Sequence, residues 1–198
     1  TATARKGQHT ATRDFTVYVA EQENLDSYLF VYFPSNDDEN LYYAISTDGF
    51  KFNPLNGDKT ILPSEGVALS GGIRDPHILR GVDGKTFYMV ATDMKCSNGW
   101  DSNRGIVLYK STDLVNWTHS TVHFPTRFPQ WSAVTHVWAP QVIWDPDYAN
   151  ADDSRGRYMV YFSLLTNDGT LPYDKLYYSY VNDDFTDLLD YPVHFYDR

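Results

Sequence analysis

The feature that most constrains the fold of this chain is a repeat of short, aromatic-rich segments at a nearly constant spacing. Three copies align around a shared aspartate: YYAISTDGFKF (42–52), VLYKSTDLVNW (107–117) and YYSYVNDDFTD (177–187). Asp48, Asp113 and Asp183 then lie in register, at nearly equal intervals along the chain. Because a side chain that recurs in every copy belongs to the architecture, we predict that these three aspartates cap turns.

A second pair of segments repeats at nearly the same spacing. RDPHILR (74–80) aligns with WAPQVIW (138–144), so Pro76 and Pro140 occupy equivalent positions in successive copies. An early proline suits the innermost strand of a propeller blade, because the first residue of a strand has few ladder partners to lose. Successive copies follow one another at the spacing of Pro76 and Pro140, and about four strands in each copy indicate a β-propeller. The alternative, a β-sandwich, predicts no such repeat.

The chain as a whole reads as all-β, because short aromatic and β-branched runs are bounded by Gly, Pro, Asn and Asp. The predicted strands outside the proline segments are residues 15–20, 28–33, 40–46, 86–92, 104–111, 158–165 and 175–181. We assign residues 1–14 to a polar N-terminal segment and residues 15–198 to a partial propeller. Its repeat units run roughly over 15–62, 70–125 and 134–190. Three units do not close a propeller, so we expect further blades on a C-terminal continuation or on a second chain.

Composition narrows the classes of partner. The chain has 16 Lys and Arg against 26 Asp and Glu, a formal net charge of −10, and its basic residues are not clustered. Because nucleic acids and anionic membranes are bound through clustered basic residues, both are excluded as partners. No apolar run is long enough to span a membrane. The numbered chain begins without a signal peptide, and we nevertheless expect a secreted or periplasmic bacterial protein.

The segment IRDPHILR holds the main candidate for catalysis. An aspartate before a proline at the start of an inner strand projects its carboxylate toward the mouth of a propeller. On a regular strand, Asp75 and His77 share one side and Arg74 faces the other. Hydrolysis of a glycosidic bond generally needs two carboxyl groups, and Asp75 can supply one of them. Asp-Pro alone is also an ordinary turn dipeptide, so the dipeptide by itself is a weak signal.

RDPHI, followed at the equivalent position of the next copy by WAPQV, resembles glycoside hydrolase family 43, and the resemblance covers roughly residues 25–198. It implies a five-bladed β-propeller, of which this chain supplies about three blades. It also implies an inverting glycosidase for arabinofuranosyl or xylosyl linkages, with a carbohydrate substrate and no required cofactor. Such enzymes use an Asp base, a second Asp and a Glu acid. Asp75 matches the base, and the other two carboxylates are expected beyond Arg198.

The resemblance and the repeat also nominate substrate-binding residues. Trp138 matches the tryptophan of the family's Trp-Ala-Pro, and either lines the sugar site or packs between blades. Gln141 stands where many relatives carry an acidic residue, and it is equivalent to His77 in the repeat, so both are predicted to line the axial channel. Asp93 either accepts a bond from a sugar hydroxyl or caps a loop. One His and one Gln do not make a metal site, so no metal is predicted and a structural calcium lacks support.

Two alternatives stay open at this point. The chain supplies one of three family carboxylates, so a non-catalytic carbohydrate-binding propeller is the first. The second is a fructosidase of the related family 32, which also contains Arg-Asp-Pro. That family carries its nucleophile in an upstream Asn-Asp-Pro region, and residues 1–70 contain no such motif.

Overall fold

The computed structural model describes residues 2–13 and 27–196, and it is all-β as the sequence predicts. At the N-terminal end, β1 (Ala2–Lys6) and β2 (His9–Arg13) pair as an antiparallel hairpin. The strand predicted over 15–20 lies outside the described residues. No helix in the described part of the chain is long and apolar enough to cross a membrane.

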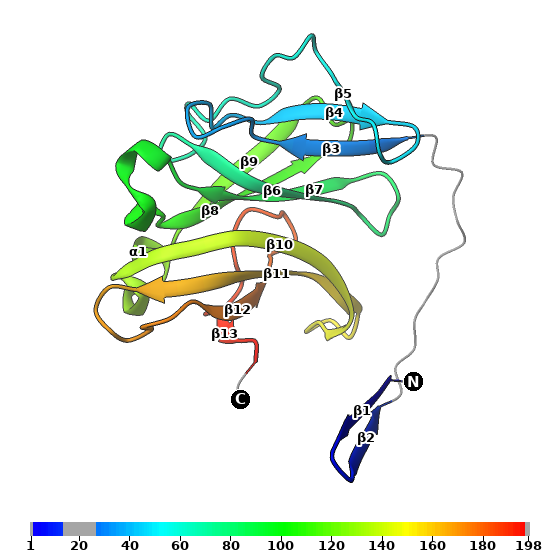
Figure 1. The fold of residues 1–198 in the computed structure, drawn as a ribbon, viewed down its shortest axis with the longest axis vertical. Coiled ribbons are helices and arrows are strands. Elements are labelled where there is room, and N and C mark those ends of the chain that lie inside the picture. Colours follow the sequence, from blue (N-terminus) through cyan, green and yellow to red (C-terminus); the bar gives the residue numbers. More distant parts are fainter. Residues whose placement is uncertain (1, 14–26, 197–198) are drawn as a thin grey trace.

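Three antiparallel sheets follow, and Figure 1 shows them stacked in chain order. The first contains β3 (Tyr28–Tyr32), β4 (Tyr42–Ser46) and β5 (Asn53–Pro54). The second contains β6 (Ile73–Arg80), β7 (Phe87–Asp93), β8 (Gly105–Ser111) and β9 (Trp117–His123). The third contains β10 (Val134–Ala149), β11 (Arg155–Thr166), β12 (Lys175–Tyr180) and β13 (Val193–His194). Within each sheet the strands neighbour one another in sequence order, so each sheet is a meander.

Four short helical turns lie in the connections within residues 27–196. These are η1 (Cys96–Asn98), η2 (Trp100–Ser102), α1 (Phe124–Arg127) and η3 (Pro129–Trp131). The six predicted strands that fall within residues 27–196 correspond to β3, β4, β7, β8, β11 and β12. The two proline segments form β6 and β10.

The second sheet is buried on both faces because it lies between the other two. Side chains alternate along a strand, so consecutive residues of β7 enter different cores. Met89 packs with Val31 and Tyr43 of the first sheet. Val90, the next residue, packs in the cluster that includes Phe162 of the third sheet. Such burial on both faces explains why β7 and β8 are apolar along their length rather than alternating with polar residues.

The turn caps predicted from the repeat are correct in two copies and wrong in the third. Asp48 and Asp113 each accept backbone N–H groups two and three residues further on, at 2.8 and 2.9 Å and at 2.9 and 2.7 Å. In the third copy Asn182 caps the turn instead, accepting N–H groups four and five residues on at 2.7 and 3.2 Å. The side chain of Asp183 is 88% exposed and pairs with Arg157. The turn after β12 is longer, so the preceding residue takes the capping position.

Candidate active site

The two inner strands β6 and β10 are interrupted at the same place. Pairing of β6 with β7 shifts between Arg74 and His77, so Asp75 and Pro76 form a bulge. The regular strand expected at Asp75 is therefore wrong: Asp75 has a left-handed backbone with φ of 48°. A non-glycine residue in this region costs about 1–3 kcal/mol and persists only where its surroundings hold it.

The bulge recurs in the next sheet. Pairing of β10 with β11 shifts between Trp138 and Gln141, which leaves Ala139 and Pro140 unpaired. Ala139 has φ of 46°, nearly the value of its counterpart Asp75. The sequence repeat between RDP and WAP is thus also a repeat of backbone conformation. Of the two equivalent residues, only Asp75 carries a carboxylate.

The carboxylate of Asp75 is exposed and is held at one oxygen. The Thr92 hydroxyl, at the end of β7, donates to Asp75 Oδ2 at 3.2 Å. The same hydroxyl oxygen accepts the backbone N–H of Ala139 at 3.0 Å, and Thr92 itself is fully buried. One side chain therefore links both bulges. Sequence reasoning did not assign this role to Thr92, although antiparallel pairing of 74–80 with 86–92 places it opposite Arg74.

On the other side of β6, Arg74 is buried in a polar cluster. Its guanidinium donates to Glu39 Oε1 at 2.6 Å and to Asn36 Oδ1 at 2.9 Å. It also lies 4.5 Å from the ring centroid of Phe33 and 5.3 Å from that of Trp100. This cluster ties the residue before Asp75 to the first sheet. Glu39 was not identified from the sequence, because its partner lies far away along the chain.

The side chains of Trp100, His136 and Trp138 form an aromatic wall at the same end of the sheets as Asp75. Trp138 is half-buried and stacks on His136, with ring centroids 3.6 Å apart and planes at 13°. Trp100 meets Trp138 edge-on at 6.5 Å. The His136 ring nitrogens lie 3.0 Å from Asp174 and 3.2 Å from Asp101. These two carboxylates belong to loops that leave β11 and β7, so the ring stack is anchored from two directions. The indole N–H of Trp138 has no hydrogen-bond partner within the described parts of the chain.

The other predicted site residues have the following surroundings. His77 is half-buried, and burial lowers its pKa; its Nδ1 accepts the backbone N–H of Val142 at 3.3 Å, which joins β6 to β10. Gln141 is exposed and accepts a hydrogen bond from the Tyr161 hydroxyl. Asp93 is buried, and its carboxylate accepts the backbone N–H groups of residues 69 and 70 at 3.1 and 2.9 Å. These contacts leave the substrate-binding roles of His77, Gln141 and Asp93 as predictions.

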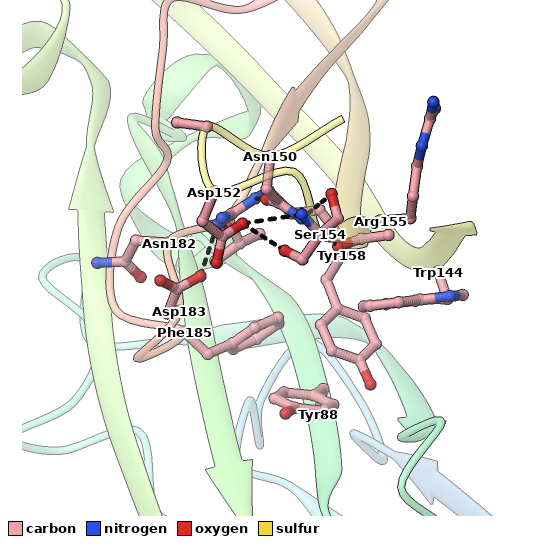
Figure 2. Close-up of a pocket in the computed structure, with 14 residues that line it drawn as sticks. Tyr88, Trp144, Asn150, Asp152, Ser154, Arg155, Tyr158, Asn182, Asp183 and Phe185 are labelled. Atoms are coloured by element: carbon pink, nitrogen blue, oxygen red, sulfur yellow. Dashed lines mark hydrogen bonds and ion pairs between the residues drawn. The ribbon is translucent and has the colours of Figure 1, made fainter. Parts of the chain in front are cut away.

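A hollow of about 570 Å³ lies at the opposite end of the second and third sheets, and Figure 2 shows its lining. Its polar side chains bind one another: Arg157 donates to Asn150 at 2.8 Å and pairs with Asp183 at 2.8 Å. Its rings also pack together, with Tyr88 and Tyr158 centroids 4.2 Å apart. Because these rings and polar groups contact one another, we take Asp75 rather than this hollow as the candidate active site.

Comparisons with known proteins show which family the chain belongs to. A family model described as "Probable glycosyl hydrolase domain", related to family 43, matches residues 23–198. The chain belongs to this family of glycosyl hydrolases. An alpha-L-arabinofuranosidase of Bifidobacterium longum subsp. longum is 33% identical over 192 residues, covering 85% of this chain.

Solved structures show the same fold. A family 43 β-1,3-galactosidase superposes with a TM-score of 0.54 at 10% identity over 89% of this chain, and 34% of its own length is covered. A glycosyl hydrolase from Bacteroides ovatus gives a TM-score of 0.53 at 17% identity over 83% of this chain, with 48% of its own length covered. The fold is thus β-propeller-like and of the family 43 type. The chain spans 16% of the length of the arabinofuranosidase that it matches.

Proposed function

We propose that the protein containing this chain is an inverting glycoside hydrolase that releases arabinofuranosyl or xylosyl units from plant-type polysaccharides or oligosaccharides. The observation that carries the proposal is the exposed carboxylate of Asp75, held on a strained bulge at the start of an inner strand. The 33% identity to a protein named alpha-L-arabinofuranosidase favours arabinofuranosyl over xylosyl substrates. We propose a secreted or periplasmic setting, where such glycans are met.

In this proposal Asp75 is the general base. A carboxylate oxygen takes a proton from a water molecule while the water oxygen bonds to the anomeric carbon and the glycosidic bond breaks. The leaving oxygen receives its proton from a carboxylic acid on the opposite side of the sugar. Acid and base stand about 6.5–9.5 Å apart in inverting enzymes, which leaves room for the water. We propose that the acid and a second Asp come from further blades, which complete a five-bladed propeller with the three sheets described above.

The aromatic wall suits the apolar face of a sugar ring. Trp138 is half-buried rather than fully packed, and it directly precedes Ala139, whose N–H is tied to Thr92 beside Asp75. A sugar placed with its anomeric carbon near Asp75 therefore has an indole within reach. Stacking on such a ring orients a sugar by its C–H groups without a charged contact. This assignment is part of the proposal.

The test is Asp75→Asn in the full-length protein, assayed on aryl arabinofuranosides and aryl xylosides. Removal of a general base lowers turnover by about 10²–10⁴-fold, so kcat should fall by that amount while the protein still folds. Asp147→Asn is a matched control, because Asp147 is exposed at the other end of β10. The configuration of the first product, followed by NMR, should be inverted. Unimpaired hydrolysis by Asp75→Asn contradicts the proposal, and sugar binding without turnover in the unmodified protein favours a non-catalytic binding propeller.

A further inference from the structure

Thr92 occupies a position that links the two inner strands at their strained residues. It lies opposite Arg74 in the pairing of β6 with β7, and its hydroxyl bridges Asp75 Oδ2 and the Ala139 N–H. We propose that Thr92 is a positioning residue that fixes which oxygen of the Asp75 carboxylate acts as the base. This inference rests on the function proposed above and deepens it.

The direction of each hydrogen bond follows from the groups involved. A backbone N–H can only donate, so the bond from Ala139 at 3.0 Å occupies a lone pair of Thr92 Oγ1. The hydroxyl hydrogen is then free to point at Asp75 Oδ2, 3.2 Å away, and an ionised carboxylate can only accept. Thr92 is 0% exposed, so bulk water does not reach its hydroxyl. The two hydrogen bonds thus run in one direction: the Ala139 N–H donates to the Thr92 hydroxyl, and that hydroxyl donates to the Asp75 carboxylate.

The same hydroxyl contacts two residues that have unfavourable backbone conformations. Asp75 and Ala139 have φ of 48° and 46°, and each precedes a proline, which further restricts its backbone. A β-branched side chain on a strand has few χ1 choices, so Thr92 holds its oxygen in place with little freedom. Ser163 pairs with Trp138 as Thr92 pairs with Arg74, so a hydroxyl residue recurs at this register position. In the third sheet the residue that follows Trp138 is an alanine, so there the hydroxyl has no equivalent carboxylate to orient.

The consequence concerns the orientation of the base. With Oδ2 engaged by Thr92, Oδ1 is the oxygen directed to the catalytic water, and the carboxylate plane is set by the buried hydroxyl. Without the hydroxyl, the carboxylate can rotate about χ2 and offer its oxygens in unproductive directions. Misorientation affects the chemical step and not the sugar contacts, so kcat falls while KM changes little.

The experiment compares Thr92→Val, Thr92→Ser and Thr86→Val in the full-length protein. Thr92→Val removes the hydroxyl at nearly constant volume, and kcat should fall roughly 10- to 100-fold with KM nearly unchanged. Thr92→Ser keeps the hydroxyl and should restore most of the turnover. Thr86 is the matched control: it is buried just before β7, at the other end of the sheet, and its hydroxyl donates to Asp83 Oδ2 at 2.6 Å. Thr86→Val also loses a hydroxyl-to-carboxylate bond and should leave kcat unchanged.

The outcomes separate this inference from the proposed function. Normal kcat in Thr92→Val, together with inactivity of Asp75→Asn, overturns the role of Thr92 and leaves Asp75 as the base. Normal activity of Asp75→Asn overturns the proposed function itself. Equal losses in Thr92→Ser and Thr92→Val also overturn the inference, because the hydroxyl is then not the cause. If Thr92→Val does not fold, Thr92→Ala also removes the hydroxyl, and an unchanged kcat in that variant refutes the proposal.

Discussion

The buried ion pair between Glu39 and Arg74 gives the sharpest stability prediction. The two side chains are 4% and 9% exposed, and they meet at 2.6 Å. Glu39 Oε1 also accepts the backbone N–H of Cys96 at 2.8 Å, so the carboxylate joins three segments. Removing one partner of a buried pair leaves an uncompensated charge and costs about 3–5 kcal/mol. Glu39→Gln keeps an acceptor oxygen, so we expect the lower end of that range, about 3 kcal/mol.

Urea denaturation of the full-length protein, followed by tryptophan fluorescence, measures this loss. With an m-value of about 2 kcal/mol per molar, a loss of about 3 kcal/mol lowers the urea midpoint by about 1.5 M. The control is Asp187→Asn, which breaks the pair with Arg127 at 2.8 Å, where the side chains are 41% and 37% exposed. Exposed pairs contribute about 0–1 kcal/mol, so this midpoint should move little.

A double substitution at the same pair tests the cause of the loss. If the cost comes from an unpaired buried charge, removing both charges should cost less than removing one. The double variant Glu39→Leu with Arg74→Met should therefore be more stable than Glu39→Leu alone. Equal midpoint shifts in Glu39→Gln and Asp187→Asn, or a double variant less stable than the single one, would refute the account.

Two further predictions concern the strands and turns of the second sheet. A Cβ added at Gly105 would overlap the backbone oxygen of Val122 on the paired strand. Gly105→Ala should therefore cost about 1–3 kcal/mol through forced backbone displacement, and an unchanged melting temperature contradicts this. Bonds from the Thr86 hydroxyl and then from backbone N–H groups lower the pKa of Asp83 to about 2. A depressed carboxyl pKa stabilises the fold above the unfolded value of about 3.9, and this contribution is lost as pH falls through about 2. The difference in melting temperature between the unmodified protein and Asp83→Asn should therefore shrink between pH 5 and pH 2, and a constant difference contradicts the assignment.

The strands could be predicted because their signals are local. Alternation, β-branched and aromatic residues and turn formers lie within a few residues of one another, and β7 and β8 fall where the sequence places them. The repeat could be predicted for a related reason, since each unit packs the same arrangement of strands and therefore carries similar residues at equivalent positions. The capping residue of the third turn was predicted wrongly, because Asn182 and Asp183 are adjacent and either side chain can cap a turn. The flanking pair is Val181 with Leu188 here and Ser111 with Trp117 in the second copy, so the third turn is one residue longer, and Asn182 caps it.

The contacts that define the candidate site join residues distant in sequence, and no local pattern contains them. Glu39 and Arg74 are 35 residues apart, and Thr92 and Ala139 are 47 apart. Each pair depends on how one sheet is stacked on the next and on the register within each sheet. Asp75 could be identified as a candidate base from the sequence, because a proline follows it and an equivalent proline recurs in the next repeat unit. Glu39 and Thr92, which support it, have no such neighbouring motif.

The bulge at each inner proline shows how one repeated scaffold can present different side chains at the same position. Both bulges present the residue before proline in a left-handed conformation, at φ of 48° and 46°. In the third sheet that residue is Ala139, whose N–H serves the hydrogen bond to Thr92. In the second sheet it is Asp75, whose carboxylate receives the other bond from the same hydroxyl. The bulge geometry is therefore shared by the second and third sheets, while the proposed chemistry depends on Asp75 and on the Thr92 hydroxyl that donates to it.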